Sequence, residues 1–211
     1  MGVCCEVARI HEDSCILALL QRYVHDLFQS IMDDFASHSS ARLFLAAVPD
    51  AGTAERIHQL ASVLKRAHRF DGKLIAPGRL HISLFALGGL PEGQLCAAWE
   101  AAMEVRTAPF AVSFDRTASF RGRTDNRPFV LVGEKGLGPL QSFRQTLGAA
   151  MKRRGLRRLA ATHFTPHVTL LYDVRGADEY PIEPIGWTVK EFVLIRSLNG
   201  HEHLVRWPLW V

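Results

Sequence analysis

The chain has 211 residues, of which 48% are hydrophobic and 22% are charged, with 25 Lys and Arg against 21 Asp and Glu. These values exclude a disordered or collagen-like chain and are typical of a globular protein with one domain or two small lobes. The net charge of +4 is compatible with an anionic partner such as RNA or a nucleotide, and it excludes no class of enzyme.

Residues 1–40 differ in pattern from the rest of the chain. Apolar residues recur at spacings of three and four from Ser14 to Phe35, which predicts an amphipathic helix, and the polar run 37–40 predicts a linker after it. We expect this helix to pack on the main body, with a membrane surface or a partner helix as the alternatives. Acidic residues near the start argue against a signal peptide, and we expect no membrane-spanning segment.

Four cysteines are present, at Cys4, Cys5, Cys15 and Cys96. Their spacing does not match a zinc site, because no two CxxC pairs occur. We interpret them as reduced thiols, which predicts a cytoplasmic protein.

Residues 41–211 are predicted to form the main domain. In its first half we expect a strand at 42–48, a helix at 53–69, strands at 73–76 and 80–87, and a helix at 92–105. The second half repeats this order, with strands at 110–120 and 128–133, a helix at 140–154, and strands at 167–172, 187–198 and 201–207. Asn199-Gly200 is typical of a hairpin turn between the last two strands. Mixed strands and helices with both kinds of connection predict an α+β fold with antiparallel sheets.

Two of the predicted strands, 80–87 and 167–172, carry a histidine followed two residues later by a hydroxyl. They contain His81-Ile82-Ser83 and His167-Val168-Thr169. Because side chains alternate along a strand, the histidine and the hydroxyl of each strand share one face, about 6.6 Å apart.

The tripeptide alone is a weak signal. Ten histidines and twenty Ser or Thr residues give about one His-x-Ser/Thr by chance, and four occur, at His38, His81, His163 and His167. Only His81 and His167 lie within alternating apolar strands, at equivalent points of the two halves and 86 positions apart (167 − 81). A single copy would be read as a packed core histidine, whereas two matched copies indicate a site.

Two facing His/hydroxyl pairs can catalyse reactions at a phosphate. Histidine titrates near neutrality, so one imidazole can accept a proton while the other donates one. The hydroxyls of Ser83 and Thr169 can donate hydrogen bonds to the nonbridging oxygens of a phosphate held between them. This chemistry needs no metal and no cofactor.

These residues resemble the two-histidine phosphoesterases, and in particular the 2′-5′ RNA ligase-like (LigT-like) RNA 2′,3′-cyclic phosphodiesterases with their HxT motifs. Further segments carry the resemblance: Arg42-Leu43-Phe44-Leu45-Ala46, the helix from Leu140 and Leu147 to Gly155, Pro166-His167-Val168-Thr169-Leu170, and Trp207-Pro208-Leu209. It covers residues 41–211 and leaves the N-terminal helix unexplained.

The resemblance implies a bilobed α+β fold, with two antiparallel sheets in a pseudo-twofold arrangement around a central cleft and helices outside. It also implies a hydrolase that opens 2′,3′-cyclic phosphate ends of RNA or small nucleotides to 2′-phosphates, with 2′-5′ RNA ligation in some members. By the same resemblance, His81 is the general acid toward the leaving ribose oxygen and His167 the general base on water. The chain departs from the family at Ser83 in place of threonine, Ala86 in place of an aromatic residue and Tyr172 in place of arginine.

Other residues leave alternatives open. Phe120 and Phe164 either stack a base or pack in the core. Two basic clusters are either RNA contacts or solvated cations; they are Lys152, Arg153, Arg154, Arg157 and Arg158, and Arg121, Arg123 and Arg127. The spacings His163/His167 and His201/His203 suggest a metal only weakly.

A noncatalytic RNA- or nucleotide-binding protein that uses the same two-histidine cleft is the alternative to the enzyme. The sequence does not indicate an oligomeric state.

Overall fold

The computed structural model describes residues 42–88, 90–120, 126–198 and 200–210. Arg42–Val211 forms one compact unit. The helix and linker predicted within residues 1–40 lie outside the described residues, so that part of the predicted domain organisation stays a prediction.

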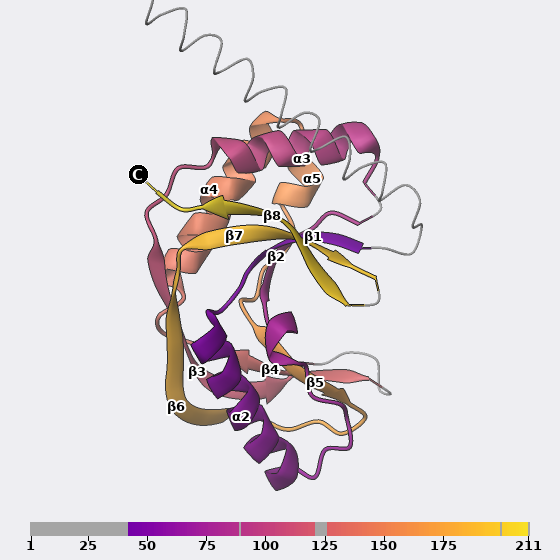
Figure 1. Ribbon diagram of the computed structural model, residues 1–211, viewed down its shortest axis with the longest axis vertical. Helices are drawn as coiled ribbons and strands as arrows, with labels where there is room; N and C mark the ends of the chain where they lie inside the picture. The colour runs from indigo at the N-terminus through magenta and orange to yellow at the C-terminus, as the bar shows by residue number, and fades with distance from the viewer. Residues whose placement is uncertain (1–41, 89, 121–125, 199, 211) are drawn as a thin grey trace, which may run out of the picture. The chain divides into compact units, whose positions relative to one another are not determined.

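The described strands form two antiparallel sheets of four strands each (Figure 1). Sheet A has the order β2-β1-β7-β8, with the bounds Ile82–Ala86, Arg42–Ala47, Glu191–Ser197 and His201–Pro208. Sheet B has the order β5-β4-β3-β6, with the bounds Val168–Asp173, Arg127–Val132, Phe110–Ser119 and Tyr180–Val189. The predicted α+β fold of two antiparallel sheets is confirmed. The two strands that carry the histidine motifs, β2 and β5, each lie at an edge of their sheet and are called the motif strands below.

Three long helices accompany the sheets: α2 (Ala51–Ala67), α3 (Glu92–Glu104) and α4 (Gly138–Arg153). Two shorter elements are α5 (Arg157–Ala160) and the 3-10 turn η1 (Pro77–Arg79). Helix α2 begins after Asp50, whose carboxylate accepts hydrogen bonds from the backbone N–H and the hydroxyl of Thr53, at 2.9 and 2.8 Å. None of the helices in the described ranges is long and apolar enough to cross a membrane.

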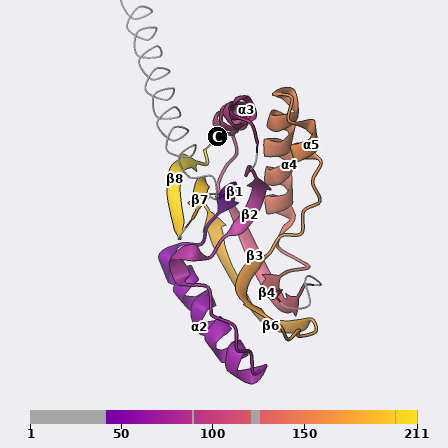
Figure 2. The ribbon, with the colours of Figure 1, turned by 90° about the vertical axis from the view of Figure 1, so that its right-hand side faces the viewer.

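Helices α2 and α4 each contact the sheet that does not contain the strand they follow. Helix α2 follows β1 of sheet A but contacts β5 and β6 of sheet B. Helix α4 follows β4 of sheet B but packs on sheet A, where Phe143 lies 5.3 Å from Phe192 of β7 and Gly148 lies against Phe85 of β2. In both views α2 lies apart from α3, α4 and α5 (Figures 1 and 2).

Both motif strands carry a bulge at the same point. The pairing of β2 with β1 passes from Phe85 to Ser83 and leaves Leu84 unpaired, and the pairing of β5 with β4 passes from Leu171 to Thr169 and leaves Leu170 unpaired. A bulge re-aims the neighbouring side chains and strengthens the local twist. The two halves therefore match in this local distortion, directly after the hydroxyl residue of each motif.

The single strand predicted at 187–198 is wrong in extent. The chain forms β6 in sheet B up to Val189 and then β7 in sheet A from Glu191, with only Lys190 between them. The crossing contains no glycine or proline, and its only sequence mark is the charged pair Lys190-Glu191, so a turn signal is absent. The start of β6 was missed because Pro181 and Pro184 lie in it, and β6 tolerates them as an edge strand.

The predicted strand at 73–76 is reduced to one bridge, between Leu74 and Leu171 of β5, together with a hydrogen bond from the Ile75 N–H to the Leu170 carbonyl at 2.8 Å. The chain turns sharply before it, and Pro77 begins η1 directly after it. At Gly72 a Cβ atom would lie 1.8 Å from the Tyr172 carbonyl oxygen, so only glycine fits this approach to β5.

The buried carboxylate of Asp173 holds this turn. It accepts hydrogen bonds from the backbone N–H groups of Asp71 (2.6 Å), Gly72 (2.7 Å) and Arg175 (2.9 Å). Burial raises the pKa of Asp173, but the hydrogen bonds from the N–H groups of Arg175, Gly72 and Asp71 outweigh it and lower the pKa below the ordinary value. The ionised carboxylate therefore stabilises the fold.

We predict that Asp173→Asn lowers the free energy of unfolding at pH 7 by about 2 kcal/mol, because an amide replaces a carboxylate that accepts three hydrogen bonds. Since the folded pKa is depressed, this stabilisation is complete above the unfolded value of about 4 and is lost as pH falls through the folded pKa. Urea unfolding should thus show a difference between variant and wild type at pH 7 that shrinks below about pH 4. Asp178→Asn, at an exposed position, is the control, and an equal effect of both variants would contradict the prediction.

Candidate active site

The two motif histidines are held in the same way. Each precedes the first residue of its motif strand, and each places its Nδ1 near the carbonyl oxygen two residues upstream: His81 at 2.8 Å from that of Arg79, and His167 at 2.7 Å from that of Thr165. A carbonyl can only accept, so each Nδ1 donates its N–H. In the neutral ring this leaves the lone pair on Nε2. In both imidazoles Nε2 is thus the nitrogen that can exchange a proton.

The two hydroxyls differ in their contacts. The Ser83 Oγ lies 3.1 Å from the Nε2 of His81, to which it donates when that ring is neutral. The half-buried Thr169 makes no side-chain hydrogen bond within the described part of the chain. The Nε2 of His167 likewise has no partner among the described residues. The His81 pair is therefore internally hydrogen-bonded, whereas the His167 pair has no hydrogen bond of this kind among the described residues.

Aromatic rings contact both histidines. His81 lies 4.9 Å from Phe44 of β1 and 5.0 Å from His201 of β8, measured between ring centroids. His167 lies 5.0 Å from Phe120, with the rings edge to face. The sequence analysis did not predict Phe44 or His201 as part of the site, because their contacts to His81 arise only from the pairing of distant strands.

Burial lowers the pKa of His81 below its ordinary value. The hydrogen bond to the Arg79 carbonyl opposes this, whereas the positive charges of His167, Arg79 and His203 lower the pKa further. His167, 86 positions away in the chain, is thus one of the groups whose positive charge lowers the pKa of His81.

Arg144 of α4 ties the two motifs together. Its Nε donates to the carbonyl of Leu84, the bulge residue of β2, at 3.1 Å, and its Nη2 donates to the carbonyl and hydroxyl of Thr162, at 3.0 and 2.7 Å. The guanidinium lies 4.2 Å from the ring centroid of Phe85 and 4.6 Å from that of Phe164. One side chain thus fixes β2 and the segment that leads to His167.

The contacts favour one of the two roles that the sequence left open for Phe164, and one of the two for the first basic cluster. Phe164 packs on Arg144, which supports its role in packing. Arg153 and Arg154 of the first basic cluster form ion pairs with α3, Arg153 with Glu104 and Arg154 with Glu100 and Glu104, so these cations stabilise the contact between two helices. No three His, Cys, Asp or Glu side chains within the described ranges form a group that could hold a metal ion.

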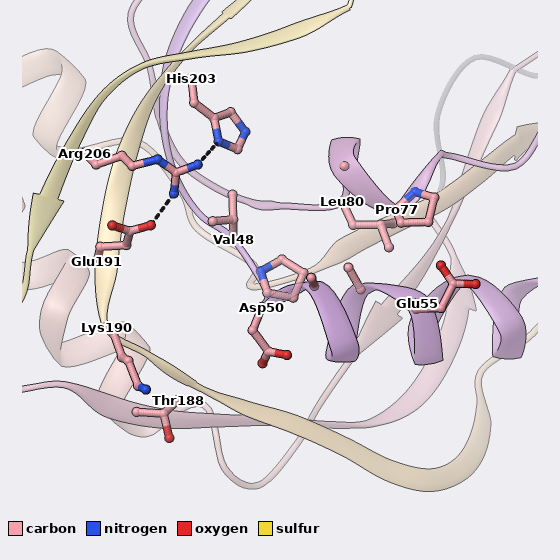
Figure 3. Close-up of a pocket in the computed structure, with 14 residues that line it drawn as sticks. Val48, Asp50, Glu55, Pro77, Leu80, Thr188, Lys190, Glu191, His203 and Arg206 are labelled. Carbon is pink, nitrogen blue, oxygen red and sulfur yellow. Dashed lines mark hydrogen bonds and ion pairs between the residues drawn. The ribbon is translucent and has the colours of Figure 1, made fainter.

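A cavity of about 840 Å³ lies beside the His81 half of the site (Figure 3). The start of α2, the η1 turn, the β6–β7 crossing and β8 surround it. Arg206 on its wall pairs with Glu191 and with the Nδ1 of His203. None of His81, Ser83, His167 and Thr169 lines this cavity, but Leu80, which directly precedes His81, does.

The fold of two antiparallel sheets agrees with the family resemblance that the His-x-Ser and His-x-Thr segments indicate. The family model described as "2'-5' RNA ligase superfamily" matches residues 48–201. The chain therefore belongs to the 2′-5′ RNA ligase superfamily.

Individual relatives agree with this assignment. The chain is 31% identical over 130 residues to an RNA 2′,3′-cyclic phosphodiesterase of Archaeoglobus fulgidus, a match that covers 61% of this chain and 70% of the relative. Among solved structures, Escherichia coli LigT complexed with 3′-AMP aligns with a TM-score of 0.57 and 25% identity, over 80% of this chain and 96% of LigT. A Thermus thermophilus protein aligns with a TM-score of 0.62 at 23% identity, over 80% of this chain and 97% of that protein, and shows the same fold.

We predict that Arg144→Met lowers the free energy of unfolding by about 2 kcal/mol, because the Leu84 and Thr162 carbonyls lose a charged donor. It should also lower any turnover that depends on His81 and His167, since both segments lose their common anchor. Urea unfolding measures the first effect and steady-state kinetics the second. Arg144→Lys should recover part of both, and Gln145→Met, at the exposed neighbouring position, should change neither. Wild-type stability of Arg144→Met would contradict the prediction.

Proposed function

We propose that the protein is a metal-independent phosphodiesterase that hydrolyses 2′,3′-cyclic phosphate ends of RNA or of small nucleotides to 2′-phosphates. The observation that carries the proposal is the matched pair of imidazoles, each with Nδ1 on a backbone carbonyl and Nε2 available. Membership of the superfamily, the curated Archaeoglobus fulgidus relative and the 3′-AMP complex of LigT support the same substrate chemistry.

In this proposal His167 is the general base and His81 the general acid. The Nε2 of His167 takes a proton from water as the water oxygen forms a bond to phosphorus. The bond from phosphorus to the ribose 3′ oxygen breaks, and protonated His81 donates its proton to that oxygen, which leaves a 2′-phosphate and a 3′-hydroxyl. The open Nε2 of His167 supports its role as base.

Ser83 and Thr169 are proposed to donate hydrogen bonds to the nonbridging phosphate oxygens, where negative charge builds up in the transition state. The unpartnered hydroxyl of Thr169 supports this role, and Ser83 would turn from His81 to the phosphate when His81 is protonated. If a 5′-hydroxyl of RNA replaced water, the same proton transfers would join two RNA ends through a 2′-5′ link, which is how ligation would arise at this site.

Hydrolysis of a 2′,3′-cyclic mononucleotide in excess chelator tests the proposal. We expect activity to persist and a 2′-phosphate to form, and we expect His81→Ala and His167→Ala each to lower kcat by at least about 100-fold, the usual contribution of a general acid or base. The control is His163→Ala, at an exposed histidine four residues before His167. Dependence on added metal, or activity unaffected by both substitutions, would contradict the proposal. Nucleotide binding without turnover would support the noncatalytic binder instead.

The lowered pKa of His81 predicts a specific pH dependence. Because the free enzyme must hold a proton on His81, kcat/KM should fall with rising pH from a point below the ordinary histidine value of about 6.5. A bound phosphate anion stabilises the imidazolium and raises its pKa, so the falling limb of kcat should lie at higher pH than that of kcat/KM. Rates measured in a phosphate-free buffer series would check this. A falling limb of kcat/KM above pH 6.5 would show that a His81 with a lowered pKa is not the general acid.

A further inference from the structure

A third imidazole, that of His201, lies against His81 and has no part in the proposed proton transfers. His201 is half-buried and is the first residue of β8, at the edge of sheet A opposite to β2. Its ring centroid is 5.0 Å from that of His81, with the planes at 71°. Phe44 contacts both rings, at 4.9 Å from His81 and 5.5 Å from His201. Three rings from three parts of sheet A are therefore in mutual contact.

The strand register explains how these rings meet. His201 pairs with Ser197 of β7, and Phe44 of β1 pairs with Ile195, two residues earlier on the same strand. Paired residues of antiparallel strands point to one face, and alternate residues of a strand share a face. His201 and Phe44 thus lie on the same face of sheet A, the one over which the His81 ring is placed.

The setting of His201 keeps its ring uncharged. Its Nδ1 is buried and has no hydrogen-bond partner within the described residues, so a proton there would bring a charge without an acceptor. Burial and the positive charges of His81, Arg79 and His203 lower the pKa of His201 to about 4, and the backbone of Arg79 opposes this. At neutral pH His201 does not compete with His81 for a proton.

We propose that His201 is a positioning residue, whose uncharged ring together with Phe44 holds the His81 imidazole in the orientation for proton transfer and shields that side of it from water. The other groups that face His81 are the backbone and guanidinium of Arg79, the Ser83 hydroxyl, and the side chains of His167 and His203. The kinetic part of this proposal rests on the proposed function of His81 as the acid.

The test compares His201→Phe, which keeps a ring, with His201→Ala, which removes it. We expect His201→Phe to keep kcat within about threefold of wild type and His201→Ala to lose about 10- to 100-fold in kcat with little change in KM, as for a misplaced general acid. NMR titration of the His81 ring should show its pKa rising toward about 6.5 in His201→Ala and unchanged in His201→Phe. Glu183→Ala, at an exposed position of β6, is the control and should behave as wild type.

Each outcome decides the proposal. Equal losses in His201→Phe and His201→Ala would show that a ring nitrogen acts directly, which would overturn a positioning role. An unchanged kcat and an unmoved His81 titration in His201→Ala would overturn it as well. Thermal unfolding checks that each variant is folded, and His201→Leu, which keeps bulk without a ring, provides a second measurement. Wild-type protein without turnover would refute the proposed function, whereas the NMR titration would still test the effect of His201 on His81.

Discussion

The carboxylate of Asp173 supplies the constraint on which the site depends. It lies on β5, six residues after His167, and accepts hydrogen bonds from the backbone N–H groups of Asp71 and Gly72 in the turn. That turn starts the segment that bridges to Leu171, enters η1 and reaches His81. The buried carboxylate, which accepts three N–H groups, therefore connects the strand of one motif histidine to the segment that leads to the other.

Arg144, a cation, makes a second connection between the two segments. Asp173 accepts hydrogen bonds from N–H groups of the segment before His81, whereas Arg144 donates hydrogen bonds to carbonyl groups of β2 and of the segment before His167. Both side chains hydrogen-bond backbone groups that have no partner in a regular helix or sheet. Asp173 does so at the turn of Asp71 and Gly72, and Arg144 at the Leu84 bulge. The imidazoles can then be held by short local hydrogen bonds, because the longer segments that carry them are already fixed.

The sequence predicts those residues of the site that belong to a short local pattern of apolar and polar residues. His81 and His167 stand out because each belongs to an alternating apolar strand with a hydroxyl two residues away, and the repeated order of elements predicts two similar halves. Asp173 contacts Asp71, Arg144 contacts Leu84 and His201 contacts His81, across 102, 60 and 120 (201 − 81) residues respectively, so no local pattern marks these contacts. The β6–β7 crossing is not predicted because no glycine or proline separates the two strands, which belong to different sheets.

Helices α2 and α4 each contact the sheet that does not contain the strand they follow, and this limits how the chain can be divided into fragments. A fragment that ended after α3 would contain β1 and β2 but neither the helix α4 nor the strand β7 that cover and flank them, while its own α2 would face no sheet. The apolar surfaces left open would match those of the missing half. A cut between α3 and β3 would therefore leave apolar surface uncovered on both fragments, so neither fragment contains a complete sheet A with the helix that packs on it.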